Sequence, residues 1–69
     1  MVYRDKRGWL YKVMPGLGSD CWKARYCKPG RNNWHCVTIL DWRSTEAEAE
    51  ADLAAWAAKK GMTAVEDLK

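Results

Sequence analysis

The sequence predicts an α+β fold: a three-stranded antiparallel sheet (a meander) packed on one face by a C-terminal α-helix. Two observations lead to this prediction. Residues 9–40 alternate apolar and charged side chains, as strands do, and turn-forming residues divide them into three segments. From residue 45 onward, apolar residues instead recur with the period of a helix. At 69 residues, the chain is expected to form one small domain that spans residues 1–69.

Three segments have the composition of strands. The first covers residues 9–14 (WLYKVM) and ends at a Pro-Gly pair, and the second covers residues 21–27 (CWKARYC). Residues 28–33 (KPGRNN) connect it to the third, residues 34–40 (WHCVTIL), because Pro and Gly favour a tight turn. The short connections predict antiparallel pairing of all three strands.

The helix is predicted by its ends as well as by its period. Thr45 and Glu48 have the spacing of a capping box. Acidic residues fill the first two turns, and Lys59 and Lys60 lie in the last turn, as the helix dipole favours. Gly61 is a natural stop. One apolar stripe is expected to pack on the sheet: Ala49, Leu53, Trp56 and Ala57.

The two ends of the chain have weaker patterns. Residues 1–8 and 62–69 are expected to be flexible. Thr63 and Glu66 repeat the capping-box spacing, which predicts a short terminal helical turn.

Alternation assigns the strand residues to two faces of the sheet. The more apolar face is expected to lie under the helix: Trp9, Tyr11, Val13, Trp22, Ala24, Tyr26, Val37 and Ile39. The other face is expected to be open, and it combines cations and apolar residues without an acid: Leu10, Lys12, Met14, Lys23, Arg25, Trp34, Cys36, Thr38 and Leu40. A solvated sheet surface, a nucleic-acid platform and a protein interface all fit such a face.

Charge divides the chain into two halves. Residues 1–43 hold nine Lys or Arg and three acids, whereas residues 44–69 hold three Lys and six acids. A basic sheet backed by an acidic helix favours a polyanionic partner on the sheet side. The major groove of DNA, about 12 Å wide, admits a β-ribbon, so the geometry allows contact there.

Other features argue against catalysis, cofactors and membranes. The three cysteines lack the spacing of a zinc site, and reduced cysteines in a cytoplasmic protein are the simpler interpretation. One histidine without a paired carboxylate, in a domain too small for a deep pocket, predicts no enzyme activity, no cofactor and no small-molecule substrate. No segment resembles a signal peptide or approaches the roughly 18 apolar residues of a membrane span.

The order of elements resembles a known arrangement. Trp22–Tyr26 (WKARY), the Lys28–Gly30 turn (KPG) and the helix opening Thr45–Ala49 (TEAEA) resemble the small DNA-binding domains at the N-terminus of phage and transposon tyrosine recombinases. These domains share their plan with the AP2 family. The resemblance covers roughly residues 9–60. Trp42 departs from the pattern because it lies three residues before the helix-opening Thr, where the family usually has an aromatic residue two before.

The resemblance implies a mobile-element protein, without a catalytic domain, that holds its sheet in the major groove. We therefore predict a small non-enzymatic module that binds double-stranded DNA. The expected nucleic-acid-binding residues are Lys12, Lys23, Arg25, Trp34 and Thr38 on the sheet, with Lys28 and Arg31 in the turn. The alternative is a protein-interaction module or a homodimer that buries Trp34, Leu10 and Met14.

Overall fold

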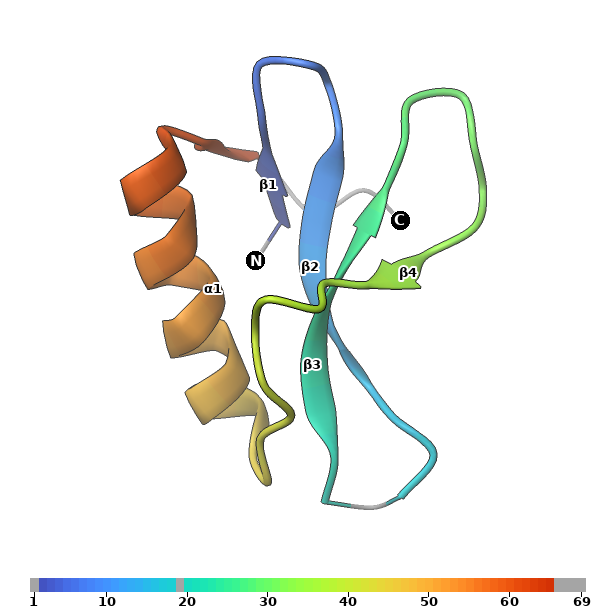
Figure 1. The fold of residues 1–69 in the computed structure, drawn as a ribbon, viewed down its shortest axis with the longest axis vertical. Coiled ribbons are helices and arrows are strands. Elements are labelled where there is room, and N and C mark those ends of the chain that lie inside the picture. The colour runs from blue at the N-terminus through green and yellow to red at the C-terminus, as the bar shows by residue number, and fades with distance from the viewer. Residues whose placement is uncertain (1, 19, 66–69) are drawn as a thin grey trace.

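The computed structural model describes residues 2–18 and 20–65, and it shows one helix packed against an antiparallel sheet (Figure 1). The sheet has five strands in the order β4-β3-β2-β1-β5. The elements are β1 (Val2–Arg4), β2 (Leu10–Pro15), β3 (Trp22–Cys27), β4 (His35–Cys36), α1 (Glu46–Lys60) and β5 (Thr63–Val65).

The β2–β3 hairpin is the centre of the sheet. Its register runs from Leu10 opposite Cys27 to Pro15 opposite Trp22, six pairs in all. The turn that joins these two strands lies at one end of the sheet, and the β1–β2 and β3–β4 connections lie at the other (Figure 1). The two strands agree with the prediction to within one residue at each end.

Helix α1 has the predicted ends. The Thr45 hydroxyl accepts a hydrogen bond from the backbone N–H of Glu48, at 3.2 Å, and Thr45 itself has an extended backbone. Gly61 ends the helix in the left-handed conformation, with φ of 71°, and its N–H bonds to backbone carbonyls of the last turn. Both ends are therefore satisfied by local sequence.

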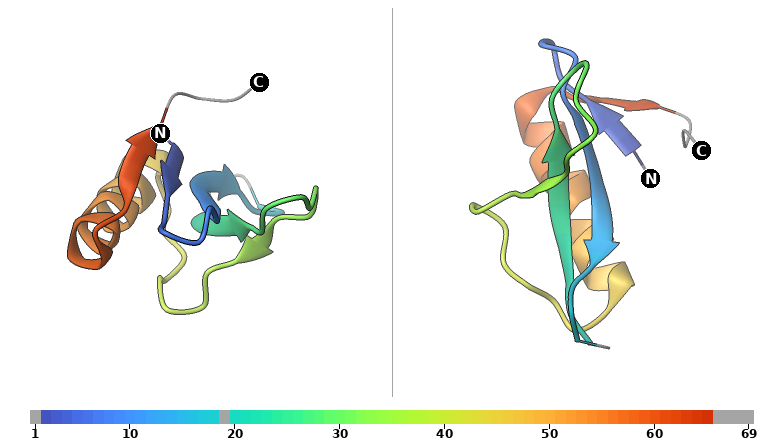
Figure 2. Two further views of the ribbon diagram at one scale, coloured as in Figure 1. Left: turned by 90° about the horizontal axis from the view of Figure 1, so that it is seen from above. Right: turned by 90° about the vertical axis from the view of Figure 1, so that its right-hand side faces the viewer.

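The core lies between α1 and the β2–β3 hairpin (Figure 2). Tyr11, Val13 and Ala24 contribute one side, and the predicted helical stripe contributes the other through Ala49 and Leu53. The Trp56 ring packs edge-on against the Tyr11 ring, with centroids 5.4 Å apart. The helix thus covers the sheet face that alternation assigned to it.

The sheet differs from the prediction because it has five strands and not three. Val2–Arg4 pairs with β2 on one side and with β5 on the other, although it lies in a segment expected to be flexible. Thr63–Val65 forms β5 at the start of the expected helical turn, and the rest of that turn, from Glu66 on, lies outside the described residues. Segments of three residues show no readable alternation. They become strands through their neighbours, because β1 pairs with the edge of β2 and β5 pairs with β1.

The predicted length of the third strand, residues 34–40, is wrong. Only His35–Cys36 pairs with β3, and the chain turns away after Val37. Val37 reaches the core as expected. Ile39, expected under the helix, is 67% exposed. Leu40, expected on the open face, packs against the core. The chain leaves the edge of β3 after Val37 and returns to it at Arg43, whose backbone pairs with that of Trp22.

Candidate nucleic-acid interface

The sheet face away from α1 carries the basic residues of the central hairpin. Lys12 lies opposite Arg25 across β2 and β3, and Arg25 lies opposite Cys36 of β4. Lys23 lies opposite Met14, two residues along the hairpin from the pair of Lys12 and Arg25. Since the intervening Val13 and Ala24 belong to the core, these side chains point to the other side of the sheet. We call Lys12, Arg25 and Trp34 the sheet-face cluster.

Trp34 belongs to this cluster through its contact with Lys12. The ammonium group of Lys12 lies 4.9 Å from the centre of the Trp34 ring. Because Lys12 is on β2 and Trp34 immediately precedes β4, this cation–π contact passes across β3, where Arg25 lies. Arg25 is half-buried, and its Nε is buried without a hydrogen-bond partner in the structure. A buried donor of this kind costs free energy until an acceptor reaches it.

Lys23 is less available than its place on the strand suggests. The residue is only 9% exposed, and its ammonium group lies 5.3 Å from the centre of the Trp42 ring. Trp42 comes from the segment between β4 and α1, beside the backbone pairing of Trp22 with Arg43. Lys23 therefore supports the position of Trp42 and is a weaker candidate for contact than Lys12 or Arg25.

Among the residues that the structure describes, no carboxylate forms an ion pair with the sheet-face cluster. Within residues 2–18 and 20–65, no ion pair joins Lys12, Lys23 or Arg25 to a carboxylate. Ion pairs lie elsewhere, between Arg7 and Asp5 at 3.0 Å and between Arg43 and Asp52 at 2.7 Å. The second one ties the segment before α1 to the helix, on the opposite side of the sheet.

Lys28 and Arg31 do not join the sheet-face cluster. Their turn follows β3, and the Lys28 ammonium group lies 5.3 Å from the centre of the Trp9 ring. That ring stacks on Tyr26, which points to the same side of the sheet as the core residue Tyr11. The residues predicted from sequence thus form two separate groups on opposite sides of the sheet.

Thr38 is not on the open sheet face, and its expected position beside Lys12 is wrong. It lies in the turn after β4, is exposed, and lines a shallow cavity with Trp9, Tyr26 and Val37 on the helix side of the sheet. Alternation failed at this residue because the strand ends at Cys36.

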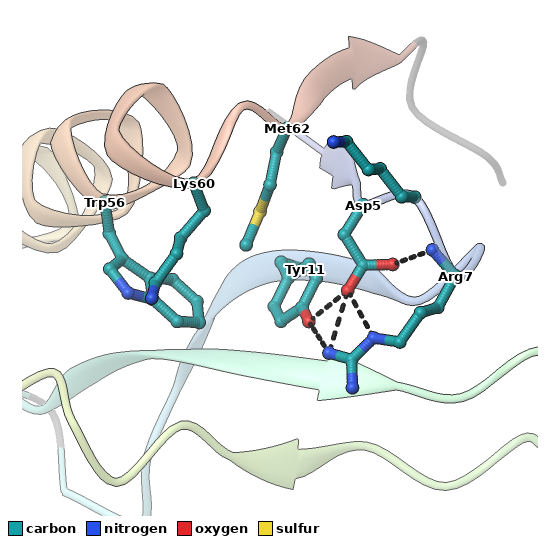
Figure 3. Close-up of a pocket in the computed structure, with 7 residues that line it drawn as sticks. Asp5, Arg7, Tyr11, Trp56, Lys60 and Met62 are labelled. Atoms are coloured by element: carbon teal, nitrogen blue, oxygen red, sulfur yellow. Dashed lines mark hydrogen bonds and ion pairs between the residues drawn. The ribbon is translucent and has the colours of Figure 1, made fainter.

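A hydrogen-bonded cluster around Asp5 was not predicted from the sequence (Figure 3). Its carboxylate accepts hydrogen bonds from the Tyr11 hydroxyl at 2.8 Å, from the Trp9 backbone N–H at 3.0 Å and from the Arg7 backbone N–H at 2.9 Å. Burial raises the pKa of Asp5, but these hydrogen bonds outweigh it and hold the pKa below its usual value. Asp5 followed by Gly8 is a turn signal that the sequence does contain.

The Asp5 cluster forms one wall of an open cavity of about 350 Å³. Trp56 and Lys60 of α1 and Met62 form the other wall (Figure 3). The Nε1 donor of Trp56 is buried and lacks a partner in the structure. The cavity contains both an acid and cations, and most of the polar groups of its Asp5 wall bond to one another, so it has no clear preference for one charge.

The three cysteines, Cys21, Cys27 and Cys36, are free thiols. In the part of the chain that the structure describes, no three His, Cys, Asp or Glu side chains come together as metal ligands. The one helix described there is too short and too polar to cross a membrane.

Comparisons with protein-family models, with curated proteins and with solved structures gave no match. The fold and the site by themselves define a small α+β protein with a basic sheet face.

Proposed function

We propose that this protein binds double-stranded DNA through the sheet-face cluster. One observation carries the proposal: Lys12 and Arg25 are directly opposed across two strands, and neither forms an ion pair with a carboxylate of residues 2–18 and 20–65. Directly opposed like charges destabilise a sheet. A polyanion would relieve this repulsion, because its phosphate oxygens would place negative charge beside both cations.

The shape of the surface agrees with the charge. The two long strands, β2 and β3, form a ribbon of the kind that the major groove admits. The acidic first turn of α1 lies behind the sheet, so it does not oppose a phosphate backbone on the cluster side. The sequence resemblance to recombinase N-terminal domains supports the same surface, since those domains also present a sheet to DNA.

The test is a titration of fluorescently labelled duplex DNA, followed by anisotropy across a series of salt concentrations. We expect binding that weakens with salt, with a slope of log K on log salt of about −2 to −4 for two to four phosphate contacts. Absence of binding at tens of micromolar protein in low salt contradicts the proposal.

A charge-matched pair of variants locates the surface. Lys12→Gln/Arg25→Gln should weaken duplex binding at least about tenfold and make the salt slope shallower by about 2. Lys59→Gln/Lys60→Gln removes the same charge from the exposed end of α1 and should change binding little. Equal losses in both variants would mean that only net charge matters. Thermal unfolding of each variant checks that the fold is retained, and Lys12→Gln alone serves if the double variant unfolds.

The alternative of a protein interface or homodimer through Trp34, Leu10 and Met14 stays a prediction. These three side chains are half-buried within the monomer, and the large apolar residues exposed among those described are instead Leu17, Ile39 and Trp42. Light scattering on the free protein separates the two functions, since a dimer that covers the sheet-face cluster leaves no surface for duplex DNA.

A further inference from the structure

The turn between β3 and β4 builds a second basic surface on the other side of the sheet. A cavity of about 260 Å³ lies there, lined by Tyr26, Lys28, Arg31, Asn33 and His35. Apart from the phenol and imidazole rings, the lining offers two cations and one amide, and it contains no acid. It therefore selects for an anionic group, and its chemistry is distinct from that of the mixed cavity beside Asp5.

The Tyr26 and His35 rings form one wall of this cavity, and Trp9, which does not line it, stacks behind Tyr26. Trp9, Tyr26 and His35 form a row across three neighbouring chain segments, because Tyr26 lies opposite His35 in the sheet. The Trp9 and Tyr26 rings stack with centroids 5.4 Å apart and planes 17° from parallel. The His35 ring continues the row, 5.5 Å from the Tyr26 ring and tilted by 37°. His35 is the exposed member at the end of the row.

The basic wall is held by a defined turn. The Arg31 N–H donates to the Lys28 carbonyl oxygen at 3.1 Å, with Pro29 and Gly30 between them and a φ of 75° at Gly30. Pro followed by a left-handed Gly is the signature of a type II turn. The buried Cys27 thiol donates a hydrogen bond to the Arg31 carbonyl oxygen at 3.0 Å, and this bond holds the end of the turn against β3. The backbone that carries the two cations is therefore ordered before any ligand arrives.

We propose that this cavity binds one nucleotide of a single-stranded nucleic acid. The base packs on the exposed His35 ring, and Arg31 holds the phosphate; the Lys28 side chain, which lies over Trp9 in the free protein, turns toward the phosphate on binding. Stacking platforms beside cations are how proteins bind unpaired strands, because every base has a flat face and every linkage a charge. The inference extends the proposed nucleic-acid function, but it uses different residues on the opposite side of the sheet.

The test uses a fluorescently labelled oligo-dT strand and measures its binding by anisotropy. His35→Ala should weaken binding about tenfold, the effect of losing one base–aromatic stack. His35→Phe keeps a flat ring and should bind like the parent protein. Lys28→Gln/Arg31→Gln should weaken binding and also flatten its salt dependence. Because His35, Lys28 and Arg31 are exposed, none of these changes is expected to unfold the protein.

Two competitors identify what the cavity recognises. Thymidine monophosphate should displace the strand at lower concentration than inorganic phosphate does. Equal competition by the two, or equal binding by His35→Ala and the parent protein, would show a site for phosphate alone and overturn the inference.

The result separates this inference from the proposed function. Duplex binding that depends on Lys12 and Arg25, together with oligo-dT binding that ignores His35, overturns only the inference. Oligo-dT binding that depends on His35, in a protein that fails to bind duplex, overturns only the proposed function.

Discussion

At the scale of single residues, Asp5 shows how one carboxylate organises a turn. It is 13% exposed at the side chain and accepts hydrogen bonds from two backbone N–H groups, the Arg7 guanidinium and the Tyr11 hydroxyl. These bonds join the β1–β2 turn to the core, since Tyr11 also packs against α1 through Trp56. The cluster therefore connects local turn chemistry to the packing of the whole domain.

Asp5→Asn should destabilise the protein at pH 7 by about 1–2 kcal/mol, because the hydrogen bonds lose a charged acceptor. The folded-state pKa of Asp5 is lowered, so its contribution is fully present above the unfolded pKa of about 3.9 and is lost as pH falls through the folded pKa. The difference between parent and variant should therefore shrink at acid pH. Urea unfolding at pH 7 and near pH 3 measures it.

Asp20→Asn is the control, since Asp20 is exposed in the β2–β3 turn. A difference between the Asp5 variant and the parent protein that stays constant down to pH 3 would contradict a role for the Asp5 charge.

Gly16 allows Trp42 to lie against the sheet. A Cβ at this position would come within 2.6 Å of the Trp42 Cζ3 atom, whereas one at Gly18 would meet only the Cys21 Sγ, at 3.3 Å. Gly16→Ala should therefore push the indole away from Lys23 and destabilise the protein by about 1 kcal/mol, the lower end of what overpacking costs. The tryptophan emission spectrum and urea unfolding report the two effects. Gly18→Ala should have the smaller effect, and a ranking in the opposite order would be evidence against this packing.

At the scale of elements, α1 is set by its sequence at both ends. Thr45→Ala removes the acceptor for the Glu48 N–H and should cost about 1 kcal/mol. Thr45→Ser keeps a hydroxyl and should cost much less. Thermal unfolding followed by the helical circular dichroism signal tests both. Equal losses for Ala and Ser would show that the hydroxyl does not cap the helix.

The elements that the sequence predicts best are those that carry their own signals. Strands β2 and β3 alternate over six residues each, and α1 has a cap, a dipole pattern and a glycine stop. Strands β1 and β5 carry no such signal, because Val2–Arg4 is a strand only through its neighbours. Strand β4 is shorter than its apolar composition suggests, since the chain leaves the edge of β3 after Val37 and pairs with it again only at Arg43.

The candidate site was predictable to the same extent. Alternation is enough to place Lys12 and Arg25 on the face away from the helix. The burial of Lys23 was not predictable, because Trp42 reaches it from a segment outside any strand. Alternation continued past the end of β3 places Lys28 on the side of Tyr26, two residues before it, and the contact of Lys28 with Trp9 agrees with this.

At the scale of the whole molecule, the sheet separates two basic surfaces. The sheet-face cluster lies on one side, and the cavity of the β3–β4 turn lies on the other, beyond the part that α1 covers. Strand β4 forms that edge of the sheet and is only two residues long. Because the two surfaces lie on opposite sides of the sheet, a single straight duplex cannot lie against both at once.

This separation predicts that duplex DNA and oligo-dT bind together. Saturating unlabelled oligo-dT should leave most of a labelled duplex bound, with a modest weakening from phosphate repulsion that fades as salt screens it. Anisotropy of the labelled duplex, combined with light scattering of the mixture, distinguishes a ternary complex of protein, duplex and oligo-dT from displacement of the duplex by oligo-dT. In Lys28→Gln/Arg31→Gln the oligo-dT should lose its effect on the duplex. Complete displacement of duplex by oligo-dT, with the same midpoint in this variant and in the parent protein, would mean that both ligands occupy the Lys12 and Arg25 surface.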